Sequence, residues 1–327
     1  MNRPAAAALG ALRGALPLRL RRAAKAALRA AVDAVPPLAR ERDARALRRR
    51  MRAALGYEPD LRNPLTYNER LAHKILYDRD PRLVCTSDKI AVRDFVAKRI
   101  GPEYLVPLIG TYGRTADVPW DSLPNRFVLK ANHGSGTNLI VRDKAAVDRA
   151  EALRRADGWL AENHYWWTAE WAYSRIRPRL LVEALLEGDA EGKPPLDYKY
   201  YVFHGRPRIL DVHIDRFGAG YRYLQRDAET LGPLPFRWGD LAAPGGDSSA
   251  DLPAAEVRAM AELAARVGAG FDHVRVDLYL SGGRIWFGEL THYTSNACAP
   301  FFPDDYDRVL GDLWVDPGRS LIVPGTP

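Results

Sequence analysis

The stretch NRFVLKANHGSGTNLIV, residues 125–141, decides how the fold is interpreted. An apolar run at Phe127–Leu129 ends in Lys130, a glycine-containing turn follows, and a second apolar run begins at Leu139. A Walker phosphate loop has its lysine after the glycines and just before a helix, in the order GxxxxGK[ST]. Here the lysine comes first and a strand follows, so the segment predicts a β-hairpin. Its glycine-rich part is either a plain turn or a different phosphate-binding loop.

The composition is that of a globular protein with a sizeable core. The chain has 327 residues, of which 47% are hydrophobic and 27% charged. No window reaches the roughly 18 to 20 unbroken apolar residues that a membrane-spanning helix needs. With only Cys85 and Cys298, a thiolate zinc site or a disulfide framework is not expected, and a reducing, cytoplasmic compartment is.

The net charge of +7 is unevenly distributed. Residues 1–55 hold 14 Lys+Arg and 3 Asp+Glu, a net of +11, which leaves 34 and 38, a net of −4, for residues 56–327. The first segment predicts two basic amphipathic helices, at 16–35 and 40–57. They could pack on the body, hold the protein at an anionic membrane surface or dock a partner. The acidic body disfavours a nucleic-acid binder.

Residues 56–177 begin with helices and continue into a first group of strands. Thr66 and Glu69 have the spacing of a capping box at a helix start. Ser87 or Asp88 is expected to cap a second helix that ends at Gly101. Strands are expected at 104–113 and 126–136, and then a helix at 145–163 that extends toward the aromatic segment beginning at His164.

After Pro178 the sequence is dominated by strands. The expected strands lie at 179–186, 197–205, 207–216 and 220–227, a helix follows at 253–270, and the last element is a hairpin at 273–291. The hairpin turn is Ser281–Gly283. This order predicts an α+β protein of two packed lobes, and the cleft between lobes is where a ligand is expected.

Charged residues interrupt the expected strands. These residues are Lys130, Glu183, Asp197, Lys199, Arg275, Asp277 and Glu289. A buried charge is costly unless it is paired or binds a metal or ligand. Lys89 and Lys130 could be surface residues with buried stems or phosphate contacts. The glycines beside Lys130 would let backbone N–H groups approach an anion, with Ser135 and Thr137 as further donors.

The hairpin at 273–291 offers the sharpest candidate site. Arg275 and Asp277 lie two residues apart and therefore face the same side of one strand, and Glu289 lies on the returning strand. Two carboxylates from paired strands suit Mg²⁺, which takes oxygen ligands and substrate phosphates. The alternative is a cross-strand ion pair on a solvated face. No zinc spacing and no GxSxG nucleophile motif is present.

Taken in order, SDKIAVRDFV, FVLKANHGSGTN, LLVEALL, DYKYYVFHG, VRVDLYL and WFGELTHYTSNACAPFFPDDYDRVLG resemble the ATP-grasp superfamily. The chain is most similar to its TupA-like branch, which is associated with bacterial surface-polysaccharide gene clusters. The resemblance covers roughly residues 60–315 and lies in the ordered set of motifs. It implies an ATP-grasp fold that holds ATP and Mg²⁺ between two α+β lobes.

The resemblance also implies roles for individual residues. Nucleotide contacts would come from Lys89, Lys130, Asn132, His133, Gly134, Ser135, Gly136, Thr137, Glu183, Ala184, Leu185, Asp197 and Lys199. Lys130 and Arg275 would act on the transferring phosphoryl group, and residues 132–138 would close over the phosphates as a lid. Asp277, Glu289 and Thr291 would hold the metal. Many ATP-grasp enzymes have Asn where this chain has Thr291, a weaker ligand, so the number of metal ions stays open.

The implied activity is that of a carboxylate–amine ligase. ATP would phosphorylate a carboxylate, and an amine would displace phosphate from the resulting acyl phosphate. This chemistry needs positioning and charge neutralisation rather than a protein nucleophile. The carboxylate would belong to a cell-surface polysaccharide, its precursor or a small molecule. The alternatives are a kinase that phosphorylates a sugar hydroxyl and a nucleotide-binding protein without catalysis.

These expectations divide the chain into five segments. They are a basic helical arm at 1–55, an N-terminal lobe at 56–124, an ATP-grasp lobe with the glycine-rich lid at 125–185, a C-terminal lobe with the metal site at 186–315, and a tail at 316–327. The arm could hold the enzyme at the inner face of the membrane. No nucleic-acid partner is expected.

Overall fold

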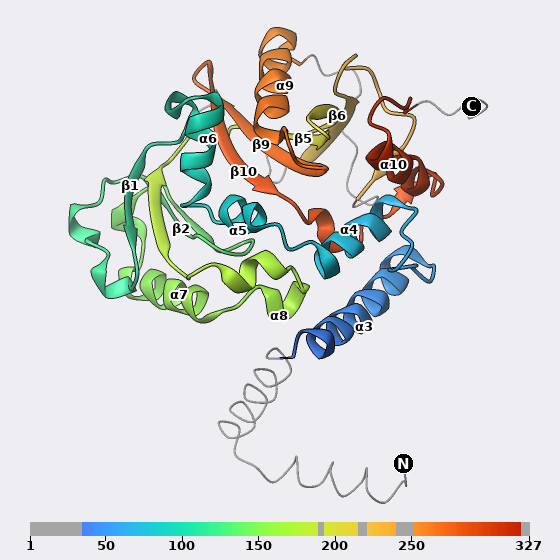
Figure 1. Cartoon of the computed structure of the whole chain (residues 1–327). Coiled ribbons are helices and arrows are strands. Elements are labelled where there is room, and N and C mark those ends of the chain that lie inside the picture. Colours follow the sequence, from blue (N-terminus) through green and yellow to red (C-terminus); the bar gives the residue numbers. More distant parts are fainter. Residues whose placement is uncertain (1–34, 189–192, 215–220, 240–251, 322–327) are drawn as a thin grey trace, which may run out of the picture. The chain divides into compact units, whose positions relative to one another are not determined.

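The computed structural model describes residues 35–188, 193–214, 221–239 and 252–321 (Figure 1). The chain divides into two compact units, residues 1–50 and 51–327. Helix α3, Pro36–Leu55, confirms the helix expected at 40–57. The helix expected at 16–35 lies, apart from its last residue, outside the described residues. None of the helices that the structure describes is both long and apolar enough to cross a bilayer.

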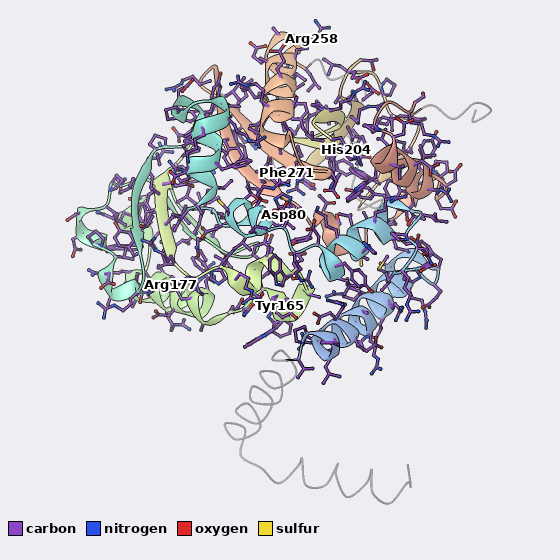
Figure 2. All side chains as sticks on the ribbon, viewed as in Figure 1. Asp80, Tyr165, Arg177, His204, Arg258 and Phe271 are labelled. Carbon is purple, nitrogen blue, oxygen red and sulfur yellow. The ribbon has the colours of Figure 1, made fainter. Side chains whose placement is uncertain are left out.

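The second unit contains seven further α-helices among its described residues. They are α4 (Tyr67–Tyr77), α5 (Pro81–Ser87), α6 (Val92–Ile100), α7 (Arg149–Ala161), α8 (Tyr165–Thr168), α9 (Ala254–Gly268) and α10 (Tyr306–Val315). Short 3-10 turns are η1 (Pro102–Tyr104), η2 (Thr115–Asp117), η3 (Trp120–Ser122), η4 (Lys144–Ala146), η5 (Trp171–Arg175) and η6 (Thr294–Ala297). Tyr165, which opens α8, and Arg177, which precedes the next strand, are labelled in Figure 2.

The expected capping box at the start of α4 is confirmed. The Thr66 hydroxyl accepts a hydrogen bond from the Glu69 amide at 3.2 Å, and a Glu69 carboxylate oxygen accepts one from the Thr66 amide at 3.0 Å. These two bonds satisfy amide groups that a helix N-terminus would otherwise leave without a partner.

The helix expected after Ser87 or Asp88 starts later than predicted. Ser87 ends α5, Asp88 accepts hydrogen bonds from two amides of the following turn, and α6 begins only at Val92 and ends before Gly101. The reason is tertiary, because the Lys89 amide donates to the Asn132 carbonyl at 2.9 Å. The helix expected at 145–163 is also shorter than predicted, because α7 begins at Arg149 and ends at Ala161, and α8 is a separate turn of helix.

A four-stranded antiparallel sheet has the order β1-β4-β2-β3. Its strands are β1 (Leu108–Tyr112), β2 (Phe127–Ala131), β3 (Asn138–Val141) and β4 (Leu180–Ala184). Phe127, Leu129, Leu180 and Val182 enter a buried core that includes residues of α7. Because side chains alternate along a strand, Lys130 and Glu183 lie on the opposite face. The β2–β3 pairing confirms the hairpin predicted for residues 125–141.

A five-stranded antiparallel sheet has the order β10-β9-β5-β6-β7. Its strands are β5 (Leu196–Phe203), β6 (Arg206–Ile214), β7 (Arg222–Asp227), β9 (His273–Ser281) and β10 (Arg284–Thr291). Helix α9 packs on one face, where Gly268 lies against Val202. Gly282 and Gly283 turn the β9–β10 hairpin with positive φ, as the sequence predicted. Strands β8 (Arg237–Trp238) and β11 (Phe301–Phe302) form a separate pair.

Candidate functional site

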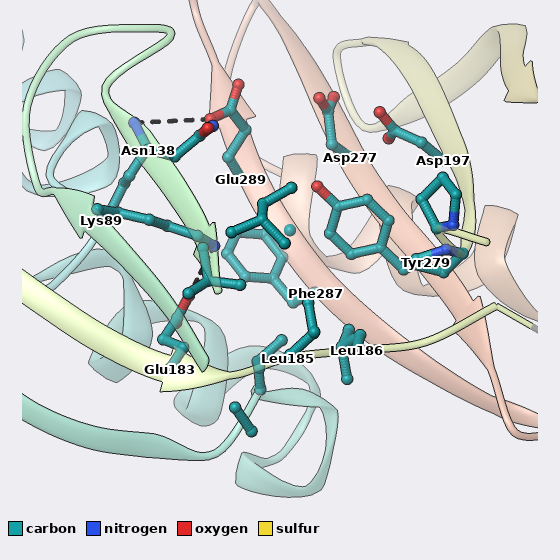
Figure 3. Close-up of a pocket in the computed structure, with 18 of the residues that line it drawn as sticks. Lys89, Asn138, Glu183, Leu185, Leu186, Asp197, Asp277, Tyr279, Phe287 and Glu289 are labelled. Atoms are coloured by element: carbon teal, nitrogen blue, oxygen red, sulfur yellow. Dashed lines mark hydrogen bonds and ion pairs between the residues drawn. The ribbon is translucent and has the colours of Figure 1, made fainter. Parts of the chain in front are cut away.

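A cavity of about 370 Å³ lies between the faces of the two larger sheets that carry charged residues (Figure 3). Its volume is in the range of small-molecule sites. The predicted site residues that line it are Lys89, Lys130, Ser135, Gly136, Thr137, Glu183, Ala184, Leu185, Asp197, Asp277 and Glu289. The carboxylates of Glu289, Asp277 and Asp197 lie along one end in Figure 3, whereas Leu185 and Leu186 lie at the other.

The four-stranded sheet, the smaller of the two, forms one wall of the cavity, and this wall is built around Glu183. One oxygen of this carboxylate accepts from Arg93 at 2.9 Å and the other from Lys130 at 2.7 Å. The side chain of Glu183 is 9% exposed, so both cations compensate a largely buried charge. Lys130 is held beside the cavity by this pair and remains 27% exposed. A ligand with negative charge could therefore contact its ammonium group from the cavity.

The glycine-rich loop between β2 and β3 forms the next part of the wall. Gly134 and Gly136 have φ of +78° and +74°, a left-handed conformation that favours glycine. The Lys89 ammonium donates to the Gly134 carbonyl at 2.8 Å, which ties α5–α6 to the loop. Ser135, Gly136 and Thr137 line the cavity, and because the Thr137 hydroxyl donates to the His133 carbonyl at 3.4 Å, the loop offers an anion its backbone N–H groups and the Ser135 hydroxyl.

Asn132 and His133 are directed away from the cavity. The Asn132 side chain accepts from the Arg179 amide at 2.8 Å and donates to the Arg177 carbonyl at 3.1 Å. The His133 ring contacts the Glu162 carbonyl at 3.1 Å, and burial lowers its pKa. Both residues anchor the base of the loop, and a direct nucleotide contact for them remains a prediction.

The wall of the cavity that the five-stranded sheet forms contains a buried ion-pair network. Arg275 donates to both oxygens of Asp277, at 2.6 and 2.7 Å. Lys199 contacts Asp277 at 2.6 Å and Asp197 at 2.8 Å. Burial alone would raise the pKa of Asp277, but Arg275 and Lys199 hold it well below its usual range. Asp277 is therefore ionised and held rigidly against the strand.

Glu289 lies opposite Asp277 in the register of β9 and β10. One oxygen contacts Arg275 at 3.4 Å and accepts from the Thr291 hydroxyl at 3.1 Å, and the other lies 3.7 Å from the Lys89 ammonium. Burial would raise the pKa of Glu289, but the charge of Lys89 and then that of Arg275 keep it below its usual value. Thr291 thus contacts Glu289 rather than the cavity.

A β-bulge at Gly288 sets the position of Glu289. The register shifts between Phe287 and Glu289, so Gly288 has no partner on β9. A Cβ at this position would lie 2.9 Å from the Tyr279 ring and 3.0 Å from the Asp277 carbonyl oxygen. Only glycine allows this close approach, and with the bulge both Phe287 and Glu289 line the cavity.

The donor set suits a magnesium-bound nucleotide. Each carboxylate oxygen offers two lone pairs, and Asp277 Oδ1 accepts one hydrogen bond from Arg275. Among the described residues, no three His, Cys, Asp or Glu side chains form a metal cluster. Mg²⁺ commonly takes one or two carboxylates together with phosphate oxygens, so Asp277 and Glu289 fit that pattern. Lys89, Lys130 and the loop amides suit the phosphates.

Some residues of the candidate site were not expected from the sequence. Tyr279 lines the cavity and shares the face of Asp277, so its spacing of two could have revealed it. Phe287 reaches the cavity only through the bulge. Arg93 pairs with Glu183 across 90 positions of sequence, and no local pattern indicates that contact. Six residues predicted for the site are not among those that line the cavity. They are Asn132, His133, Gly134, Lys199, Arg275 and Thr291.

Comparison with known proteins gave structural matches and one family. D-alanine–D-alanine ligase from Bacillus anthracis, complexed with ATP, is 12% identical, with 64% of this chain and 54% of that chain covered and a TM-score of 0.38. ATP-grasp ligase PsnB, complexed with a phosphomimetic variant of its minimal precursor, Mg and ADP, is 11% identical, with 72% and 60% covered and a TM-score of 0.39.

The chain therefore spans little more than half the length of these solved structures. No curated protein matches it. The family model described as TupA-like ATPgrasp matches residues 69–315, which include both sheets and every residue of the site described above. The chain belongs to the TupA-like ATP-grasp family.

Proposed function

We propose that the protein is an ATP- and Mg²⁺-dependent carboxylate–amine ligase. The observation that carries this proposal is the cross-strand pair of Asp277 and Glu289, which faces Lys89 and Lys130 in one cavity. The carboxylates would hold Mg²⁺, the lysines and loop amides would bind the phosphates, and Leu185, Leu186 and Phe287 offer apolar surface for the base. Mg²⁺ supplies neutralisation of the phosphate charge.

The reaction proceeds in two steps. A carboxylate oxygen of the acceptor attacks the γ-phosphorus, and ADP leaves. The amine nitrogen then attacks the acyl carbon, inorganic phosphate leaves with the bonding electrons, and the nitrogen loses a proton. The protein contributes position and charge, with Arg275 held at the carboxylate pair by Asp277. Closure of residues 132–138 would exclude water from the acyl phosphate.

The acceptor and the location belong to the same proposal. The carboxylate is that of a cell-surface polysaccharide or its precursor, in keeping with the association of TupA-like proteins with bacterial surface-polysaccharide gene clusters. The protein would work in the cytoplasm at the inner face of the membrane. The net charge of +11 in residues 1–55 supports attraction to anionic lipid.

The test measures ADP and phosphate release with Mg²⁺-ATP, a uronic acid and a panel of amino acids. The double variant Asp277→Ala/Glu289→Ala should lose about 100-fold or more of the amine-dependent rate, because the carboxylate oxygens are absent. The control Glu256→Ala/Asp304→Ala removes two exposed carboxylates and should retain it. Full activity in the first variant contradicts the metal assignment. ADP formation without amine dependence or phosphate release indicates a kinase.

A further inference from the structure

A second cavity, of about 210 Å³, opens on the same face of the five-stranded sheet. Arg275 and Lys199 line it, whereas their partner Asp277 lines the larger cavity. The ion-pair network therefore separates the two spaces. Any group bound in the second cavity would lie across this network from the phosphate-binding end of the first.

Aromatic rings line the second cavity. Tyr201 meets Trp238 edge to face at a centroid distance of 4.3 Å, and Tyr67 lies 5.6 Å from Trp238. His213, two residues from Asp211 on the same face of β6, stacks with Tyr221 and with Tyr223 at centroid distances of 5.8 and 6.2 Å. Aromatic rings near a carboxylate can add cation–π attraction for a bound cationic group.

A buried carboxylate, Asp211, lies beside these rings. It is 5% exposed and accepts from the Tyr201 hydroxyl at 3.1 Å and from the Trp238 indole at 3.2 Å. Its donors Tyr201, Trp238 and Gln225 are all neutral, and among the described residues no cation lies within ion-pair distance, although the charge of Arg275 acts on it from farther away. A carboxylate can accept about four hydrogen bonds, so it has capacity for a further donor.

The charges on this face of the sheet leave an excess of negative charge. Four carboxylates, Asp197, Asp211, Asp277 and Glu289, stand against the two cations Lys199 and Arg275. Lys89 approaches Glu289 from outside the sheet. The excess of negative charge at Asp277 and Glu289 suits the metal described above. Asp211 has no cation within ion-pair distance, and Arg275 acts on it only from farther away, so a ligand cation bound there would add a favourable pairing.

Strand register connects the two ends. Glu289 pairs with Asp277, Asp277 with Lys199, Lys199 with Asp211, and Asp211 with Gln225. Paired residues face the same side of a sheet, so one polar row crosses all five strands. A ligand held at Asp211 is thereby aligned with the pair Asp277 and Glu289, with Lys199 between them.

We propose that the Asp211 cavity binds the amino substrate by its ammonium group, which donates to the carboxylate beside the aromatic rings. This inference rests on the proposed ligase for the step that follows binding. Burial raises the pKa of Asp211 to about 6, so the carboxylate is charged at neutral pH, as ammonium recognition requires. Before it attacks the acyl carbon, the ammonium group gives one proton to the Asp211 carboxylate, and the polar row aligns the resulting neutral amine with the end of the large cavity where the acceptor would be activated.

The experiment titrates the full chain with two matched probe pairs, D-glucosamine against D-glucose and ethanolamine against ethylene glycol, by saturation-transfer NMR at pH 7.5. Each amine should bind the wild type at least about tenfold more tightly than its neutral partner. Asp211→Asn keeps acceptors for Tyr201 and Trp238 but removes the charge, and should abolish this preference. Asp121→Asn, which changes the net charge equally at an exposed site, should retain it.

Nucleotide binding is measured in parallel on the same samples. Asp211 lies outside the large cavity, so Asp211→Asn should bind Mg²⁺-ATP like the wild type, which also shows that it folds. Equal binding of amine and neutral probes to the wild type, or an undiminished preference in Asp211→Asn, overturns the inference even if ATP binds. Failure of ATP binding counts against the ligase alone, because the amine preference is measured without nucleotide.

Discussion

Two cations converge on Glu183 at the boundary between the core of the small sheet and the large cavity. Arg93 comes from α6 and Lys130 from β2, and each takes one carboxylate oxygen. Their positive charges would repel each other without the carboxylate. Glu183 therefore holds a helix and a strand at the positions that shape one wall of the cavity.

Replacing Glu183 by Gln should destabilise the fold by about 2 kcal/mol, because it leaves Arg93 and Lys130 adjacent and largely shielded from water. The free energy of urea unfolding measures the effect. Glu187→Gln is the matched control, since Glu187 pairs with Arg126 at a site where both side chains are nearly half exposed. That change should stay within about 0.5 kcal/mol. Equal losses in the two variants would contradict the argument.

The sequence could predict single residues where a charge interrupts an apolar strand. That pattern pointed to Lys130, Glu183, Asp277 and Glu289, all of which line one cavity. The same pattern in PRILDVHIDR would have indicated Asp211, which alternates with buried apolar residues of β6. The sequence could not show which charges pair, because Arg93 of α6 and Glu183 of β4 lie 90 positions apart and meet only in the folded chain.

At the scale of elements, local patterns predicted strands and hairpins better than helix ends. The hairpins around residues 125–141 and 273–291 and the capping box at Thr66 depend on neighbouring residues, and all three are confirmed. The start of α6 was wrong, because the turn at Lys89 is fixed by a hydrogen bond to Asn132 on another element. The bulge at Gly288 likewise depends on the ring of Tyr279 across the hairpin.

Two helical glycines provide a matched test of element packing. A Cβ on Gly311 in α10 would overlap the carbonyl oxygen of Leu65, where the chain enters α4. Gly311→Ala should therefore cost about 3 kcal/mol in the free energy of unfolding. Gly158 in α7 has nothing within 4 Å of such an atom and has a helical backbone. Gly158→Ala should stabilise the protein by about 0.5–1 kcal/mol.

Thermal and urea unfolding of both variants measure these changes. Because both replace glycine by alanine inside a helix, the difference in helix propensity is the same and the contrast reports the contact alone. A stabilising Gly311→Ala would show that α4 and α10 do not approach as closely as described.

At the scale of the molecule, the candidate site depends on registers that join strands far apart in sequence. The polar row from Glu289 to Gln225 uses residues from five strands spread over residues 196–291. The sequence predicted two lobes and a cleft, and it predicted strand content. It could not predict which residues pair across β5, β6 and β9, since pairing is set by packing against α9 and by the bulges. The second cavity follows from that register.

The final prediction concerns stability against acid and involves His273, at the start of β9. This ring is fully buried, stacks on Trp314 and contacts the Tyr67 hydroxyl at 3.2 Å. The titratable groups that act on it are Asp272, Lys74, His292 and Arg275. Burial lowers its pKa to about 3. The folded protein thus keeps it neutral at pH 5, whereas the unfolded chain protonates it below about pH 6.5.

Because the unfolded state then binds more protons, the contribution of His273 to the free energy of unfolding is complete above about pH 6.5. It declines as the pH falls toward 3. Between pH 7 and 5 the contribution of His273 should decline by about 2 kcal/mol, because about 1.4 kcal/mol is lost for each pH unit below 6.5. Urea unfolding of the wild type and of His273→Phe at both pH values measures it. The variant keeps an aromatic ring but cannot protonate, so its stability should fall by about 2 kcal/mol less. An equal decline in both proteins would mean that His273 is accessible to protons in the folded state.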